Sequence, residues 1–266
     1  ERLMPVDIIS EGVISRTVRD TARAYAGFEQ QYRASALRPI GAVAGPAKRR
    51  LRIGLVLDSI NGVKTDDDTR AAVTAAAELL AGLGHDVTPV EVPITAQFEA
   101  DFKTYWGLLA TALRSFGNRI YGVPLDRSKL DGLTVGLARY YRSQVFRTPA
   151  VIARLRHARR RYARMFAQTD VVLSPVLAHT TPLLGYLSPT VPFDVLFPRL
   201  TEYVTFTPLH NAAGAPALSL PMGESATGLP IGAHFSAAHG DERTLLELAF
   251  EIEQAQPWRR IQDTSG

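Results

Sequence analysis

The sequence predicts an α/β fold on two observations. First, an apolar run at 51–57, an Ala- and Leu-rich helical segment at 70–83 and a second apolar run at 87–92 follow one another as strand, helix and strand. Second, 46% hydrophobic and 21% charged residues over 266 positions are ordinary globular usage, which excludes disordered and collagen-like chains. No internal repeat or long linker divides the chain, so we expect residues 1–266 to form a single domain.

The first helix is predicted at about 15–30. Val18 and Ala22 begin an apolar stripe at helical spacing, and Ser15 stands where an N-cap belongs. The next helix follows the strand at 51–57. Acidic residues at 66–68 favour its N-terminus, so we interpret them as capping residues rather than as a cation site.

The middle third, 94–168, shows helical spacing and little strand signal, which predicts two or three helices. It ends in an arginine-rich stretch at 154–164. A phosphate-binding surface is one interpretation of this stretch. A solvated helix face is the favoured one, because the arginines spread around the helix while Leu155 and Tyr162 form a buried stripe.

The last third alternates strands and helices. A short strand at 171–173 ends at Ser174 and leads into a loop that reaches about residue 197. A short helix is predicted at 199–210, and strands are predicted at 217–220 and 231–235 around a turn at Gly228. Asp241 is expected to cap a final helix at 243–254.

Composition excludes several kinds of site. Cysteine is absent, so no disulfide framework, thiolate metal site or cysteine nucleophile is available. The six histidines lack metal-ligand spacing, and no nucleophile elbow, Walker A or dinucleotide-binding fingerprint occurs, so we expect neither metal nor cofactor. No apolar run has the length of a membrane span, and a net charge of +4 gives no strong argument for nucleic acid. We expect a cytoplasmic protein with no membrane partner.

Three ordered segments carry a resemblance to a known family. They are GVISRTVRD at 12–20, FTPLHNAAGAPALSLP at 206–221 and GLPIG at 228–232. Together with DVVLSP at 170–175 and the Leu-rich last helix, they resemble the C-terminal half of amidase signature enzymes. The similarity points to the bacterial branch that includes 6-aminohexanoate cyclic-dimer hydrolase. This resemblance implies part of an α/β/α sandwich with a mixed β-sheet flanked by helices.

The resemblance also implies a chemistry. Family members hydrolyse carboxamide C–N bonds through a Ser–cis-Ser–Lys triad and an acyl-enzyme, and they need no cofactor. The family's triad lies before the segment that matches 12–20, and this chain has no Gly-Gly-Ser-Ser stretch. None of its four lysines stands in the family's context. We therefore expect no catalytic residue in this chain, no activity from it alone, and a catalytic N-terminal half as its partner, with a small-molecule amide as substrate.

The resemblance assigns residues to other roles. Phe206, His210 and Asn211 lie where a wall of the acyl pocket is expected. For Asn211 we favour a helix C-cap over substrate contact, and for His210 a partly buried structural role.

Four further motif residues are expected to be structural. Arg16 and Asp20, four apart, are expected to pair on one helix. Gly214 and Pro216 are expected to shape the backbone before the next strand. Aromatic residues of the middle helices either line a substrate entrance or simply pack; they are Tyr105, Trp106, Phe116, Tyr121, Tyr140 and Tyr141.

Two other functions remain open at this point. The chain could be a stand-alone, non-catalytic binding or scaffold module, in which case an unpaired sheet edge would recruit a partner or a second copy to form a homodimer. It could also belong to an amidotransferase subunit that acts on charged tRNA. The arginines at 154–164 are the only support for that alternative, and salt-sensitive RNA binding would test it.

Overall fold

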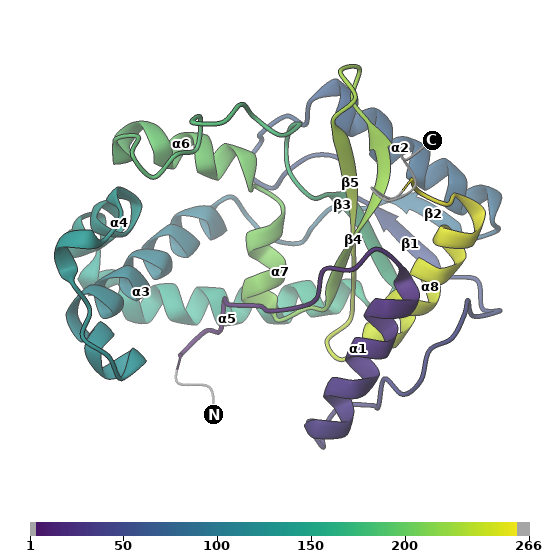
Figure 1. Ribbon diagram of the computed structural model, residues 1–266, viewed down its shortest axis with the longest axis horizontal. Coiled ribbons are helices and arrows are strands. Elements are labelled where there is room, and N and C mark those ends of the chain that lie inside the picture. Colours follow the sequence, from purple (N-terminus) through teal and green to yellow (C-terminus); the bar gives the residue numbers. More distant parts are fainter. Residues whose placement is uncertain (1–3, 260–266) are drawn as a thin grey trace.

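The computed structural model describes residues 4–259, except for the side chain of Tyr121. It contains a five-stranded sheet with the order β2-β1-β3-β5-β4 (Figure 1). The strands are β1 (Arg52–Leu55), β2 (Asp86–Pro89), β3 (Val171–Pro175), β4 (Ala217–Glu224) and β5 (Pro230–Ala237). Strand β1 pairs in parallel with β2 and β3, whereas β5 pairs antiparallel with β3 and β4. The sheet is therefore mixed and confirms the predicted α/β class.

Helices cover the two faces of the sheet unequally. On one face, the larger core is formed by the strands together with α2 (Asp67–Gly82) and α8 (Glu242–Ala255). Helix α1 (Val18–Gln31) packs against α8. On the opposite face, α5 (Thr148–Met165) and α7 (Thr207–Ala213) contact β5 through side chains. Three further helices lie beyond α5 and α7, away from the sheet (Figure 1). They are α3 (Gln97–Tyr121), α4 (Gly132–Arg142) and α6 (Phe193–Tyr203).

The first helix begins later than predicted. Thr17, not Ser15, is its N-cap, and the Thr17 hydroxyl accepts a hydrogen bond from the backbone N–H of Asp20 at 3.2 Å. Ser15 instead donates its hydroxyl to the carbonyl of Thr17 at 2.7 Å. Both residues are good caps, and only the backbone angles, which the sequence does not show, select between them.

The predicted single helix at 199–210 is wrong, because two helices occupy this region. Helix α6 begins at Phe193, inside the predicted loop, and ends at Tyr203, and α7 begins at Thr207. Pro208 lies in the first turn of α7, where proline's missing N–H leaves no helical hydrogen bond unmade. The break places Thr205 and Phe206 between two helices.

The capping predictions have different outcomes. Asp66 caps α2, since its carboxylate accepts from the N–H of Thr69 at 2.7 Å, and its second oxygen accepts from the N–H of Thr180 at 2.9 Å. Asp241 stands at the start of α8 but makes no cap to the backbone; its carboxylate accepts the Thr244 hydroxyl at 2.9 Å. The buried leucines of α8, rather than a cap at its first residue, hold this helix against the sheet.

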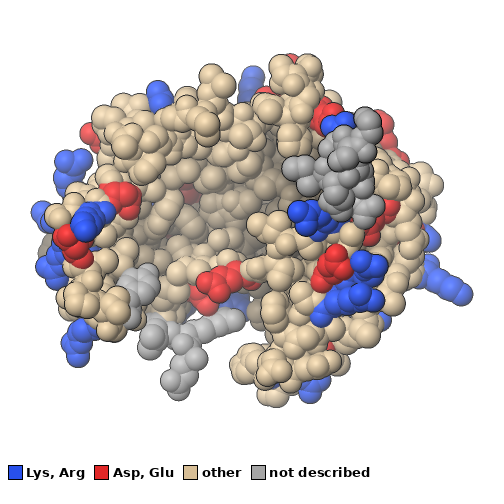
Figure 2. Space-filling model, in the orientation of Figure 1, with Lys and Arg blue, Asp and Glu red and all other residues tan. Residues whose placement is uncertain are grey.

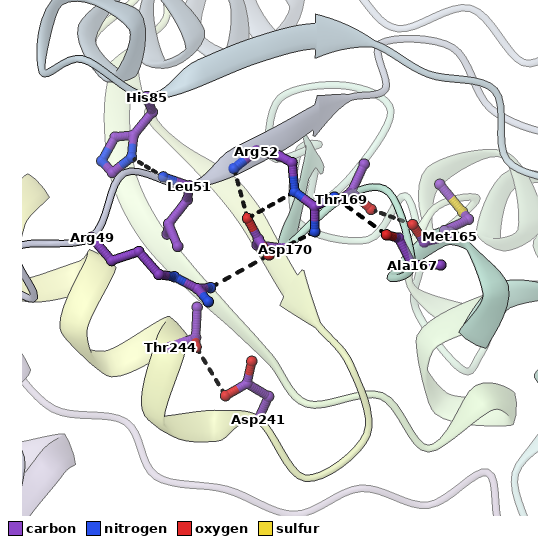
Figure 3. Close-up of polar contacts among 10 residues, drawn as sticks. All are labelled: Arg49, Leu51, Arg52, His85, Met165, Ala167, Thr169, Asp170, Asp241 and Thr244. Atoms are coloured by element: carbon purple, nitrogen blue, oxygen red, sulfur yellow. Dashed lines mark hydrogen bonds and ion pairs between the residues drawn. The ribbon is translucent and has the colours of Figure 1, made fainter.

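A charged cluster fixes the start of β1 against β3 (Figure 3). The Asp170 carboxylate accepts from the backbone N–H of Arg52 at 2.8 Å and from its guanidinium at 3.0 and 3.3 Å. Arg49 adds an ion pair at 3.4 Å. Burial opposes ionisation of Asp170, but the bonds from Arg52 and the nearby arginine charges outweigh it, so its pKa is lowered.

The N-terminal segment is held by side chains of the helical part. The Tyr105 hydroxyl, which is fully buried, donates to the carbonyl of Val6 at 2.6 Å and accepts from its N–H at 2.9 Å. Val6 and Ile8 belong to the apolar cluster that α3, α5 and α7 share. No helix within residues 4–259 combines the length and apolarity that crossing a membrane requires.

Candidate functional site

A small compartment of about 20 Å³ lies beyond the carboxyl ends of the parallel strands β1 and β3. This is the edge where α/β sheets usually bind ligands. The wall of this compartment is mostly apolar but carries several polar side chains, and we call it the polar compartment. Its polar lining includes Asp58 and Ser59 after β1, Ser174 at the end of β3, and His210 on α7. Phe206 closes one side of the compartment. In Figure 2 the visible face is hollowed between the sheet and the outer helices, and mostly uncharged atoms line that hollow.

Two buried histidines meet next to this compartment. The ring centroids of His210 and His234 lie 4.4 Å apart. The Nδ1 of His210 donates to the carbonyl of Phe206 at 3.2 Å, whereas the Nδ1 of His234 is buried without a hydrogen-bond partner. Burial lowers the pKa of His210 to about 4. Burial, and the neighbouring His210, also lower the pKa of His234 well below its ordinary range. Both imidazoles are therefore neutral at pH 7.

The strand register surrounds His234 with hydroxyl-bearing residues. Ser174 on β3 and Ser219 on β4 stand directly opposite it, so the three residues form one row across the same face of the sheet. Two residues farther along β5, the Ser236 hydroxyl bonds the Tyr162 hydroxyl at 2.8 Å. Burial raises the pKa of Tyr162, which keeps this phenol protonated.

An aromatic compartment adjoins the polar one. Phe98, Phe102 and Trp106 are spaced four residues apart along α3, and Phe197 of α6 faces them. The two compartments share Ile60 and Thr205 in their walls. We refer to them together as the double cavity.

Asn61 organises the junction between the two compartments. Its side-chain oxygen accepts from the Ser59 hydroxyl at 2.5 Å and from the Thr205 hydroxyl at 2.6 Å, and its amide donates to Glu99 at 2.9 Å. These bonds join the loop after β1, the α6–α7 connection and helix α3. The junction is thus built by three segments far apart in the sequence.

The three predicted wall residues separate in the structure. Phe206 and His210 line the polar compartment, and His210 is more deeply buried than expected. Asn211 does not line it; its amide donates to the carbonyl of Ile8 at 3.0 Å. Nor is Asn211 the C-cap, since Gly214, with φ of 63°, ends α7 in the left-handed region. Direct contact of Phe206 and His210 with substrate stays a prediction.

The other predicted motif residues lie away from the double cavity. Arg16 precedes α1, so it does not form the expected helical pair with Asp20, whose carboxylate pairs with Arg19 at 3.3 Å. The carbonyl of Arg16 accepts from the indole of Trp258 at 3.2 Å. Pro216 accepts from the N–H of Ala237 at 3.2 Å and so starts the β4–β5 ladder.

The aromatic residues of the middle helices have different environments. Trp106 lines the aromatic compartment, and Tyr140 lies against the side chain of Lys103. Tyr105 and Tyr141 are buried in packing, and Phe116 is 57% exposed. The side chain of Tyr121 lies outside those that the structure describes.

Arginines of the stretch at 154–164 serve the packing of α5. Arg154 forms a two-pronged pair with the buried Asp101, at 2.6 and 2.7 Å. Arg156 donates to the carbonyl of Pro5 at 3.1 and 3.2 Å. Leu155 and Tyr162 are buried, as predicted. The arginines of the stretch are exposed, apart from the half-buried Arg159, which agrees with the favoured solvated helix face.

Sequence reasoning missed Ser59, Asn61 and Lys103, which line the double cavity. For Ser59 and Asn61 a signal was present, since both follow closely after a predicted buried strand and therefore lie at its carboxyl end. Among residues 4–259, no group of three or more His, Cys, Asp or Glu side chains is arranged to hold a metal ion.

Comparisons with known proteins agree with this architecture. The family model described as Amidase matches residues 4–246. A Mycobacterium leprae protein named as an amidase, AmiC, is 45% identical over 98% of this chain, and 6-aminohexanoate-cyclic-dimer hydrolase of Pseudomonas sp. is 28% identical over 93%. The solved 6-aminohexanoate cyclic dimer hydrolase in complex with substrate superposes with a TM-score of 0.74 at 27% identity, over 93% of this chain. The chain spans only 56%, 54% and 55% of these three proteins, respectively.

Proposed function

Because the chain belongs to the amidase family, we propose that it is the substrate-side part of an amide hydrolase whose nucleophile lies on a segment outside this chain. The double cavity carries this proposal. It joins a small compartment at the sheet edge, whose mostly apolar wall carries a few polar side chains, to an aromatic slot, and we propose that a carboxamide with an apolar arm binds along both.

The side chains of this chain support an external nucleophile. An activated serine needs a base within hydrogen-bond reach. In the part of the chain that the structure describes, no serine hydroxyl bonds a lysine or a histidine. Lys129 pairs with Asp126, Lys103 lies over two aromatic rings, and Lys48 and Lys64 are exposed.

One of the two outer strands of the sheet supplies a place for the catalytic part. Strand β4 is an outer strand, and on the face opposite α2 its residues Ala217, Ser219 and Pro221 are exposed. The partners of Ala217 and Ser219 on β5, Ser236 and His234, are buried on that same face. We propose that the catalytic part covers β4 and places its nucleophile near the polar compartment, with the serine acyl-enzyme chemistry of the family.

A chimera tests the proposal. The part of the Mycobacterium leprae relative that precedes the matched region is joined to this chain, and both the chimera and the chain alone are treated with a fluorophosphonate and assayed on simple carboxamides. We expect one adduct and turnover from the chimera, and neither from the chain alone. The upstream part alone is the control, and it should lack turnover.

Two results would overturn the proposal. Turnover by the chain alone that is lost on mutation of one of its own serines would place the nucleophile here. A chimera that melts cooperatively but neither reacts with the fluorophosphonate nor hydrolyses amides would instead favour the non-catalytic module.

A further inference from the structure

Lys103 lines the aromatic compartment without a carboxylate partner. Its ammonium lies 4.3 Å from the ring centroid of Phe197 and 4.7 Å from that of Tyr140. Within residues 4–259, no Asp or Glu comes within ion-pair distance of this ammonium. Contacts with ring faces position the ammonium, but they leave its N–H donors open to an acceptor.

The neighbouring acid is already engaged. Glu99 lies one turn before Lys103 on α3 and lines the same compartment. Its carboxylate accepts from the amide of Asn61 at 2.9 Å, within the junction that Asn61 organises. The compartment therefore presents a carboxylate that is held at the junction and an ammonium whose N–H donors are open, and an anionic group of a ligand would fit beside that ammonium.

The shape of the compartment limits the ligand. Successive rings of Phe98, Phe102 and Trp106 lie 5.8 and 6.3 Å apart and form one wall. The free volume is about 40 Å³, which is room for about three water molecules. A cavity that encloses a whole benzene ring has about 150 Å³, so a short methylene chain, or a ring that enters only in part, matches the compartment.

From this arrangement we propose that Lys103 determines substrate specificity, by binding a carboxylate on the non-reacting apolar arm of the amide. The inference rests on the proposed function, because it assigns the substrate class of that same site. The apolar arm lies in the aromatic compartment, and the carboxamide extends past Ile60 and Thr205 into the polar compartment.

Binding to the 266-residue chain tests the inference without any turnover. The chain has two tryptophans, so a Trp258→Phe background leaves Trp106 as the sole indole reporter inside the compartment. The probes are 3-phenylpropionate and its neutral isostere, 3-phenylpropionamide. Both probes should quench Trp106 fluorescence, and we expect the Kd of the carboxylate to be about tenfold lower than that of the amide. A tenfold difference corresponds to about one charge-assisted hydrogen bond.

Variants assign the preference to Lys103. K103Q should bind both probes equally, K103R should retain the preference, and K48Q, which removes an exposed lysine, should behave like the parent. Thermal melting checks each fold, and K103M, which keeps the aliphatic stem against the rings, replaces K103Q if that variant does not fold. Equal binding by the parent, binding of neither probe, or a preference that survives in K103Q would overturn the inference.

The outcome is distinguishable from failure of the proposed function. An inactive chimera with an intact carboxylate preference would refute amide hydrolysis while leaving an anion-binding compartment. If the chimera is active but the parent chain does not prefer the carboxylate, only the proposed role of Lys103 would be refuted.

Discussion

The imidazoles of His210 and His234 pack against each other with their ring centroids 4.4 Å apart, and the Nδ1 of His234 is buried with no hydrogen-bond partner. The pair joins α7 to β5 on the sheet face that carries the polar compartment. Neither ring can gain a proton without placing a charge in a buried, closely packed layer, and this sets the sign of the pH response.

Acid should destabilise this chain through the histidine pair. The pKa of His210 falls from 6.5 in the unfolded chain to about 4, so the unfolded state binds more protons between these values. The free energy of unfolding should therefore decrease by about 1.4 kcal/mol per pH unit for each such histidine as pH falls below 6.5. Urea unfolding at pH 7.5, 6.0 and 5.0 measures this slope.

His234→Leu should remove one histidine's share of that slope. Because Nδ1 has no partner to lose, the substitution should cost less than about 1 kcal/mol at pH 7. The matched control is His157→Gln, which replaces an exposed histidine on α5 and should keep the parental slope. A slope unchanged by H234L would show that this imidazole takes up a proton in the folded state.

Tyr105→Phe should loosen the N-terminal segment. The variant leaves the N–H and carbonyl of Val6 without their buried partner, which costs about 1–3 kcal/mol. Limited proteolysis should then cut near residue 6 faster, and urea unfolding should show the stability loss. Tyr32→Phe, at an 80% exposed tyrosine, is the control. Equal cleavage rates for both variants would contradict the role of the Tyr105–Val6 hydrogen bonds in holding this segment.

Gly136→Ala should disturb the wall of the aromatic compartment. A Cβ at Gly136 would lie 2.2 Å from ring atoms of Phe193, which stacks on Phe197 at 5.3 Å. Overpacking of this kind costs about 1–3 kcal/mol. The control is Gly27→Ala in α1, where a Cβ meets nothing within 4 Å, and which should stabilise by about 0.4–1 kcal/mol. Equal melting temperatures for the two variants would count against this packing.

Asp170→Asn should weaken the β1–β3 junction. The amide cannot serve two arginines and a backbone N–H as the carboxylate does, and charge-assisted bonds contribute about 1.5–3 kcal/mol each when lost. Glu78→Gln, at an exposed acid of α2, gives the same charge change without that junction. Chemical denaturation compares the two, and a loss no greater than that of E78Q would remove the structural role of the cluster.

Much of the fold could be predicted from the sequence because the signals are local. Apolar runs predicted the β1, β3 and β5 strands, and helical spacing predicted α2, α5 and α8. The α6–α7 break escaped prediction, because Pro208 is compatible both with a helix start and with a loop. Thr17 and Ser15 are chemically similar caps that local pattern cannot rank.

The candidate site was less predictable. Phe206 and His210 could be assigned by family resemblance, and both line the polar compartment. Asn211 could not, because its partner, the carbonyl of Ile8, lies 203 residues away in the sequence. The Asn61 junction and the ring contacts of Lys103 likewise depend on segments that only the folded chain brings together.

The place of β1 in the sheet has a consequence for synthesis of the chain. Strand β1 lies between β2, about 30 residues later, and β3. Asp170, which immediately precedes β3, is 118 positions beyond Arg52. Contacts of such long range form slowly, because the entropy cost of closing the intervening loop comes before the contacts can stabilise the fold. On the ribosome, β1 and β2 must therefore wait, with one side unpaired, while the helices from α3 to α5 emerge. A nascent chain that stalls before residue 175 leaves β1 without its β3 partner, and unpaired strand edges of this kind are prone to aggregate.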